Sequence, residues 1–214
     1  MLFLLVSAAL AQSPVDIGVI KNEDVRVVQR VLYTKEGRTE IGGGIGIMPF
    51  DGKTFAPQGF FEVTRHFSEA MAVEAQLGGG YGLTTSQYHQ DEAVGLAREA
   101  YRYLASVEAD LQYTPIYAKM NLGGGRILHN DVYGLVGAGA TLEQSVFPSA
   151  DITIAPSLPI GLGTRVWLKD GAALRFEIRD SVMVEKRAES GRWYPKQNVA
   201  LSVGYAWLGK KGGS

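Results

Sequence analysis

Most of the chain alternates, one residue at a time, between bulky apolar side chains and small or polar ones. In segment 197–207, for example, Val199, Leu201, Val203, Tyr205 and Trp207 share one face, and the residues between them are small or polar. A period of two is that of a β-strand whose two faces meet different surroundings. The pattern recurs along the chain and predicts eight strands: 38–48, 58–67, 70–83, 103–114, 131–143, 154–168, 172–185 and 197–207.

The connections between these strands alternate in length. The long ones are 49–57, 84–102, 144–153 and 188–196, and the short or structured ones are 68–69, 115–130 and 169–171. Outer-membrane barrels have long loops outside the cell, short turns in the periplasm and both termini in the periplasm. We therefore expect an all-β fold: a closed, antiparallel, eight-stranded up-and-down transmembrane β-barrel at 38–208, with segment 115–130 in the periplasm and a tail at 209–214.

One long connection, 84–102, also predicts a helix. It contains apolar residues that recur at helical rather than strand spacing, and the spacing continues into the next strand: Ala93, Leu96, Ala97, Ala100 and Leu104. We interpret this connection as a helical extracellular loop.

The first residues, MLFLLVSAALAQS, form an apolar stretch that ends in small residues. This is the pattern of a signal peptide, which we assign to 1–11, with Gln12 as the mature N-terminus. The alternative is a buried N-terminal strand or helix. Residues 12–37 are then a periplasmic N-terminal segment, with a short strand at 25–34.

The face opposite the aliphatic one carries charged side chains within the strands. A soluble, lipocalin-like barrel would turn its apolar face inward instead and expose these charges to water. The signal peptide and the aromatic last strand favour the membrane barrel. Because eight strands leave an interior just wide enough for side chains, we expect ion pairs to plug the lumen. The predicted lumen residues are Glu40, Glu62, Glu74, Glu108, Asp110, Arg165, Arg175, Glu177 and Arg179.

Composition narrows the functional classes. The net charge of −1 provides no basic surface for nucleic acid, and the chain has no cysteine for a disulfide or a thiolate. The chain has 27 glycines, which cluster at 42–44, 78–80 and 123–125. Glycines on one face of a strand make room for large neighbours. His66, Ser68 and Glu69 superficially offer a catalytic trio, but they fall at a turn, and His89 and His129 fall in or beside polar segments. We expect no catalytic residue, no cofactor and no metal site.

Two segments resemble the myxobacterial outer-membrane β-barrel domain family. They are 27–40, VVQRVLYTKEGRTE, and 113–119, YTPIYAK, together with Asp131, Tyr133 and the glycines at 137 and 139. The resemblance implies a small barrel of the bacterial outer membrane, and some members of the family look like subunits of gliding machinery. It brings no catalytic residues. Both motifs fall at the periplasmic rim, where they form a docking surface or, alternatively, pair with each other to close the mouth: Gln29, Arg30, Arg38, Tyr113, Pro115, Tyr117 and Lys119.

The sequence therefore predicts a structural or binding role. We expect an outer-membrane barrel that contacts membrane lipid and acts as an anchor or docking subunit for a periplasmic or other envelope-complex protein. A narrow pore is the alternative, and a lipid-modifying barrel enzyme is a weaker one.

Overall fold

The computed structural model describes residues 33–50, 53–96, 99–121, 127–168, 171–187 and 190–210. The elements follow one another as β1 (Thr39–Phe50), β2 (Thr54–His66), β3 (Met71–Gly80), β4 (Leu83–Thr84), α1 (Ser86–Ala93), β5 (Ala100–Asn121), β6 (Ile127–Phe147), β7 (Ile152–Trp167), β8 (Ala172–Lys186), β9 (Trp193–Lys196) and β10 (Val199–Leu208).

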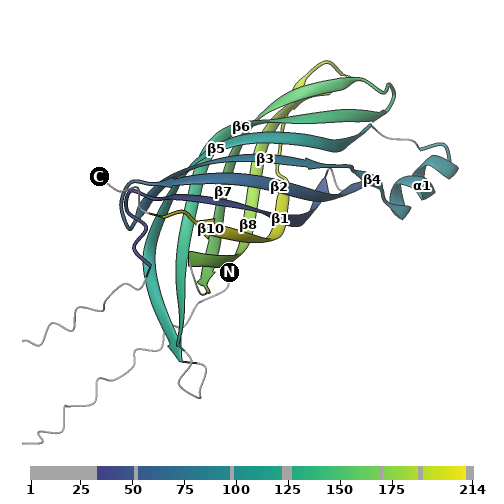
Figure 1. The fold of residues 1–214 in the computed structure, drawn as a ribbon. Helices are drawn as coiled ribbons and strands as arrows, with labels where there is room; N and C mark the ends of the chain where they lie inside the picture. The colour runs from purple at the N-terminus through teal and green to yellow at the C-terminus, as the bar shows by residue number, and fades with distance from the viewer. Residues whose placement is uncertain are drawn as a thin grey trace, which may run out of the picture. The chain divides into compact units, whose positions relative to one another are not determined.

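The long strands form a closed ring. Each pairs antiparallel with its neighbour in the order β1, β2, β3, β5, β6, β7, β8 and β10, and β10 returns to pair with β1. The seam is continuous from Glu40 opposite Leu208 to Ile47 opposite Leu201. The prediction of an eight-stranded, antiparallel, up-and-down barrel is confirmed for the described residues (Figure 1). The short strands β4 and β9 are additions that pair with β2 and β8.

The two ends of the barrel differ. One end, called here the termini end, holds the start of β1, the end of β10, the turn from β2 to β3, the end of β7 with the start of β8, and the end of β5 with the start of β6. The other, the loop end, holds β4, α1, β9 and the connections from β1 to β2 and from β6 to β7.

The prediction that 115–130 is a separate connection is wrong. Residues Ile116 to Asn121 pair with Val132 to Ile127, so β5 and β6 continue as one long hairpin, with 122–126 outside the described residues. The register shifts between Tyr113 and Ile116, which breaks the period of two at Pro115. Similarly, the predicted loop 49–57 is mostly strand, because Pro49 pairs with Phe55 and Ile47 with Pro57.

A helix does form in the connection between β3 and β5, but earlier than its spacing predicted. Helix α1 begins after Thr85, whose side chain accepts a hydrogen bond from the backbone N–H of Tyr88, and a Gly95 with φ +75° follows its end. Ala100 belongs to strand β5 rather than to the predicted loop, so that part of the prediction is wrong. The signal peptide at 1–11 and the N-terminal strand at 25–34 lie outside the described residues, apart from Tyr33 and Thr34.

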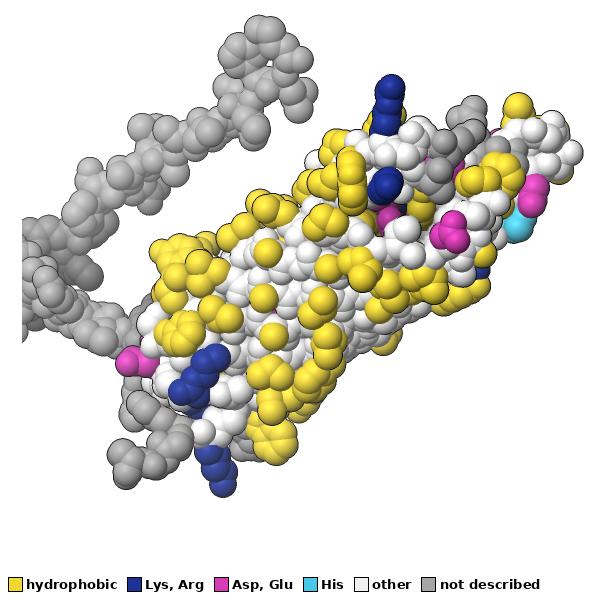
Figure 2. Space-filling view, turned by 90° about the horizontal axis from the view of Figure 1, so that it is seen from above, with side chains coloured by type: hydrophobic (Ala, Val, Ile, Leu, Met, Phe, Trp, Pro, Cys, Tyr) yellow, Lys and Arg dark blue, Asp and Glu magenta, His cyan; other side chains and the backbone are white. Residues whose placement is uncertain are grey.

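The barrel wall separates apolar from charged side chains. On β1, Ile45 is 68% exposed on the outer wall, whereas Glu40 is 1% exposed inside, and on β10 Trp207 is 64% exposed. Figure 2 shows apolar side chains spread over the outer face, with basic groups towards the two ends. Such an apolar outer band suits contact with acyl chains. Among the described residues, no helix is long and apolar enough to cross a bilayer.

Candidate functional site

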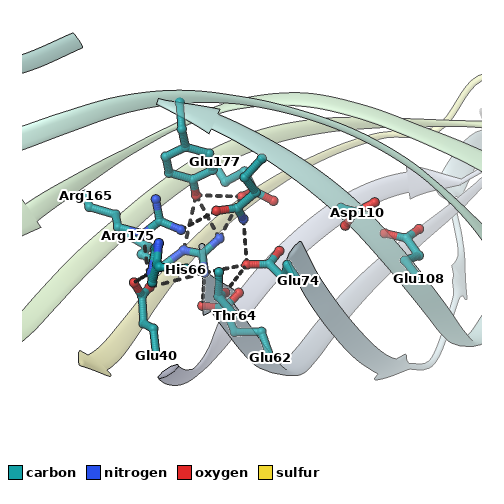
Figure 3. A network of polar contacts seen from close by, with 12 residues as sticks. Glu40, Glu62, Thr64, His66, Glu74, Glu108, Asp110, Arg165, Arg175 and Glu177 are labelled. Atoms are coloured by element: carbon teal, nitrogen blue, oxygen red, sulfur yellow. Dashed lines mark hydrogen bonds and ion pairs between the residues drawn. The ribbon is translucent and has the colours of Figure 1, made fainter. Parts of the chain in front are cut away.

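The barrel interior is built around three arginines on two neighbouring strands. Arg165 comes from β7, and Arg175 and Arg179 come from β8, four residues apart and therefore on the same face. All three side chains are buried, and Arg165 is completely so. Because β7 and β8 lie on one side of the ring, their guanidinium groups point across the lumen towards the carboxylates of β1, β2, β3 and β5 (Figure 3).

Arg175 connects opposite walls. Its Nη1 donates to Glu62 of β2 and, at 2.7 Å, to Oε2 of Glu74 of β3. Its Nε and Nη2 both donate to the hydroxyl of Tyr133 of β6, at 3.1 and 2.9 Å, and that hydroxyl donates to Glu177 at 2.7 Å. One guanidinium therefore links four strands around the ring.

Glu74 is the most densely bonded acceptor of this network. Its Oε2 accepts hydrogen bonds from Arg175, from Thr64 at 2.8 Å and from Gln112 at 2.7 Å, and its Oε1 accepts one from Arg179 at 3.1 Å. Its side chain is fully buried. A buried carboxylate is tolerated only when paired and hydrogen-bonded, and Glu74 meets both conditions.

The other two arginines extend the network along the barrel axis. Arg179 donates to Glu108, to Asp110 at 2.9 Å and to Glu177 at 2.9 Å, towards the loop end. Arg165 donates to Glu40 at 3.0 Å and to Gln112, with its guanidinium 4.1 Å from the ring centroid of Tyr133. All nine predicted lumen residues therefore lie inside the barrel and take part in one network.

Glycines on the inner face provide the space for these side chains. A Cβ at Gly42 would lie 2.6 Å from Oε1 of Glu62, and one at Gly163 would lie 2.3 Å from Cζ of Tyr133. Real Cβ atoms do not approach neighbours so closely, so larger residues at these positions would displace the network.

The termini end of the lumen is closed by the segment before β1. Lys35 enters the barrel and pairs with Asp131 at 2.7 Å, with both side chains almost fully buried. Tyr33 stacks on Trp167 at 5.4 Å between ring centroids, and its hydroxyl donates to the backbone carbonyl of residue 168. His66 lies just inside this closure, 3.0 Å from Glu40.

The loop end is closed by aromatic side chains and a second polar group. Phe50, Tyr101 and Tyr103 are buried there, and the Lys196 ammonium lies 3.6 Å from the ring centroid of Phe50. Lys196 also pairs with the buried Glu185 at 3.2 Å. The charged network is therefore covered at both ends.

The network holds more acids than bases. Its nine predicted members comprise six carboxylates and three guanidinium groups, all buried. Removing charges from water is costly, so such a cluster is weak evidence that the ion pairs stabilise the folded state. Replacing any single arginine, however, would leave carboxylates buried without a partner and would strongly destabilise the barrel. Among the described residues, no group of three or more metal-ligating side chains is placed to hold a metal ion.

The residues assigned to the periplasmic rim do not form one surface. Arg38 donates to the backbone carbonyls of Leu208 and Gly209 at the end of β10, so it ties the first and last strands together. The Tyr117 hydroxyl lies 2.6 Å from Nδ1 of His129, whose ring also contacts Tyr33. Tyr113 is exposed on the outer wall, Pro115 lies at the register shift and Lys119 is exposed on the hairpin, while Gln29 and Arg30 lie outside the described residues.

The histidine, serine and carboxylate at the β2–β3 turn do not form a catalytic trio. His66 faces Glu40, whereas the Ser68 hydroxyl accepts hydrogen bonds from the backbone of Ala70 and Met71. Glu69 accepts from the backbone N–H groups of Lys35 and Glu36. Among the described residues, neither His66 nor Glu69 hydrogen-bonds to the Ser68 hydroxyl, so the serine is a turn residue.

Sequence reasoning missed several members of the network. Tyr133 and Asp131 alternate on the inner face of β6 and could have been found from that period. Lys35 could not, because it precedes the barrel and reaches Asp131 only through the fold.

The family comparison decides what kind of barrel this is. The model of the outer membrane protein beta-barrel domain family matches residues 2–206. The chain belongs to this family. Its members are proteins of the bacterial outer membrane, and the apolar outer wall agrees with that location. No curated protein matches the sequence.

Three solved structures of outer-membrane proteins are similar to the chain at low sequence identity. The N-terminal β-barrel domain of Pseudomonas aeruginosa OprF is 10% identical, with a TM-score of 0.52 over 82% of this chain and 100% of that one. Ail of Yersinia pestis is 15% identical, with a TM-score of 0.48 over 81% and 99%, and Pseudomonas aeruginosa OprG is 14% identical, with 0.49 over 82% and 97%. The similarity to the OprF domain shows a shared fold and nothing further.

Proposed function

We propose that the protein is a non-conducting, non-enzymatic anchor of the outer membrane that docks a periplasmic or envelope-complex protein. The observation that carries this proposal is the filled lumen. Arg175 reaches Glu62, Glu74 and Tyr133 on three other strands, so the network crosses the ring from wall to wall.

The space left inside the barrel supports a closed lumen. A hollow between Arg179 and Phe50 has a volume of only about 30 Å³. This is enough for a water molecule but not for a hydrated ion moving freely. Lys35 with Asp131 at one end and Lys196 over Phe50 at the other restrict access to it.

The β5–β6 hairpin supports a docking role. At the termini end, β3 pairs with β5 only as far as Tyr113, and β7 pairs with β6 only as far as His129. Residues 116–121 and 127–128 therefore extend beyond their neighbours as an arm (Figure 1). In the topology usual for outer-membrane barrels, this arm projects into the periplasm, together with both termini.

The inner side of the arm helps to close the termini end of the barrel, and its outer side is available to a partner protein. Its inner side contributes Tyr117, which contacts His129, while Ile116 is 53% exposed and Lys119 is exposed. The outer edge of β5 beyond Tyr113 has no paired strand among the described residues, so a partner could add a strand there. The resemblance to the myxobacterial family makes subunits of gliding machinery the first partners to test.

A conductance measurement tests the closed lumen. The purified protein, inserted into planar bilayers, should give no stable channel steps in salt solution. A variant with smaller plug side chains, Arg175→Ala with Glu74→Ala, should conduct if it folds, which serves as the control for correct insertion. Steady conductance of the unchanged protein would instead support the narrow-pore alternative.

Site-specific crosslinking tests the arm. A photo-crosslinking residue at Ile116 should trap a discrete partner in intact cells, whereas the same residue at Lys186, exposed at the loop end, should not. Tyr117→Phe should retain the heat-modifiable mobility of a folded barrel. Equal crosslinking at both positions would contradict docking through the arm, and loss of folding in Tyr117→Phe would assign Tyr117 to closure alone.

A further inference from the structure

Asp180 is a charged side chain on the apolar outer wall, about halfway along β8 and beside the start of β10. It lies on β8 on the face opposite the buried Arg179, between the outward-facing Ile178 and Val182. Its neighbours across the sheet, Ile160 and Val199, are 51% and 42% exposed and apolar. Other charged residues on the outer wall of the described strands lie at or near strand ends: Arg65, Arg102, Lys119 and Lys186. An ionisable group surrounded by apolar side chains on such a wall is costly and calls for a partner.

A groove runs across the wall beside this carboxylate. It has a volume of about 600 Å³ and is lined almost entirely by apolar side chains of β5, β6, β7, β8 and β10. One bank follows a register row of four strands, and its members are Tyr113, Gly134, Leu162 and Ile178. The other bank lies two residues away along each strand and continues onto β10, and its members are Leu111, Val136, Ile160, Asp180 and Val199. Because Gly134 has no side chain, the row of side chains that forms the first bank has a gap at that position.

The width and length of the groove indicate what kind of molecule fits in it. Two residues along a strand separate the banks by about 7 Å, and four adjacent strands give a length of about 14 Å. An α-helix with its side chains is about 10 Å wide and does not fit between the banks. A single hydrocarbon chain does, and acyl chains surround this wall.

The carboxylate has capacity for one more donor. Asp180 Oδ1 accepts a hydrogen bond from the backbone N–H of Asn198 at 3.1 Å, and within the described residues this is its only hydrogen bond. A carboxylate has two oxygens and several acceptor positions, so Oδ2 remains for a ligand. An anionic lipid headgroup would be repelled, whereas a hydroxyl on a hydrocarbon chain would donate a charge-assisted hydrogen bond.

We propose that this groove binds the acyl chain of a hydroxylated membrane lipid, with the chain hydroxyl donating to Asp180 Oδ2 and the hydrocarbon lying over Gly134. The site is separate from the lumen and from the hairpin arm, so it does not depend on the proposed anchoring function. Asp180 is then the residue that distinguishes a hydroxylated chain from a plain one.

Native mass spectrometry of the refolded protein in detergent tests the proposal with a matched pair of probes. These are β-hydroxymyristoyl lysophosphatidylcholine and myristoyl lysophosphatidylcholine, which differ by one hydroxyl. A hydrogen bond to a charged group predicts that the hydroxylated probe binds about tenfold more tightly. Asp180→Asn keeps an oxygen for Asn198 but removes the charge, which should reduce the preference to about threefold. Asp180→Val should abolish the preference while leaving binding of the plain chain.

A second variant keeps the test decisive if Asp180→Val fails to fold. Gly134→Leu fills the groove without touching Asp180, and a Cβ at Gly134 would lie 3.7 Å from Leu162 Cδ2, an ordinary contact. Both probes should lose binding in this variant, with heat-modifiable mobility unchanged. Equal binding of the two probes to the unchanged protein, or unaltered binding to Gly134→Leu, would overturn the proposal and leave Asp180 as a cap for Asn198 only.

Discussion

The ring of Tyr133 occupies the space that a side chain at Gly163 would need. The two residues are register partners on β6 and β7, and a Cβ at Gly163 would lie 2.3 Å from Cζ and 2.4 Å from the hydroxyl oxygen of Tyr133. Because Gly163 has no side chain, the ring can lie over it, under the guanidinium of Arg165, with its hydroxyl between Arg175 and Glu177. One glycine thus positions the aromatic centre of the charged interior.

Gly163→Ala should therefore destabilise the barrel. The new methyl group must push Tyr133 away from Arg175 and Glu177, and overpacking of this kind costs about 1–3 kcal/mol. The free energy of unfolding can be measured by urea titration in lipid vesicles, with heat-modifiable mobility as the probe. Gly79→Ala is the matched control, since a Cβ there meets nothing within 4 Å. Equal stability of the two variants would show that Tyr133 can move at no cost.

Arg175→Gln should cost far more stability than Glu62→Gln, although the two residues are partners. Losing Arg175 leaves six buried carboxylates of the network with two arginines, and removing one member of a buried pair costs about 3–5 kcal/mol. Losing the charge of Glu62 lowers an existing excess of negative charge, and glutamine still accepts a hydrogen bond, so about 1 kcal/mol is expected. The same urea titration measures both. A reversed order would contradict the charge balance inferred for the interior.

Lys35 and Asp131 should behave as a coupled pair. Lys35→Met leaves a buried carboxylate unpaired, and Asp131→Asn leaves a buried ammonium unpaired, so each should cost about 3 kcal/mol. The double variant should cost clearly less than the sum of the two, which a double-mutant cycle measures directly. Additive costs would mean that the two side chains do not meet in the folded barrel.

Pro195 should protect the loop end against self-association. The backbone N–H of Arg187 donates to Arg192, and that of Ser181 donates to Asn198. Hydrogen-bonded pairs alternate with non-bonded pairs along two antiparallel strands, so the backbone of Pro195 points away from β8, to the free edge of β9. Proline has no N–H group to donate at that edge, so another strand pairs with it less readily. Pro195→Val should increase oligomer formation in detergent, measured by analytical ultracentrifugation. Tyr194→Val, on the side paired with β8, is the control and should remain monomeric.

The alternation of apolar and polar side chains along the chain was enough to predict most of the fold. Segments such as 197–207 and 172–185 have one apolar and one polar face over their whole length, and this local pattern is enough to indicate strands, their number and their antiparallel order. It failed at Pro115 and Pro49, where a register shift or a proline interrupts the period while pairing continues. A local pattern cannot show pairing, because pairing is supplied by the neighbouring strand. Spacing also misplaced the helix, since capping by Thr85 decided where it begins.

The sequence by itself determined that charged residues share one face of the strands and aliphatic residues the other, because side-chain direction in a strand follows from position alone. Only the tertiary structure decided which charges meet. Ring closure brings Arg175 to Glu62 and Glu74, more than a hundred residues away, and brings Lys35 from outside the barrel to Asp131. It also places Asp180 beside a groove made by five strands. Such contacts depend on strand register and on closure of the ring, which no single segment of the chain contains.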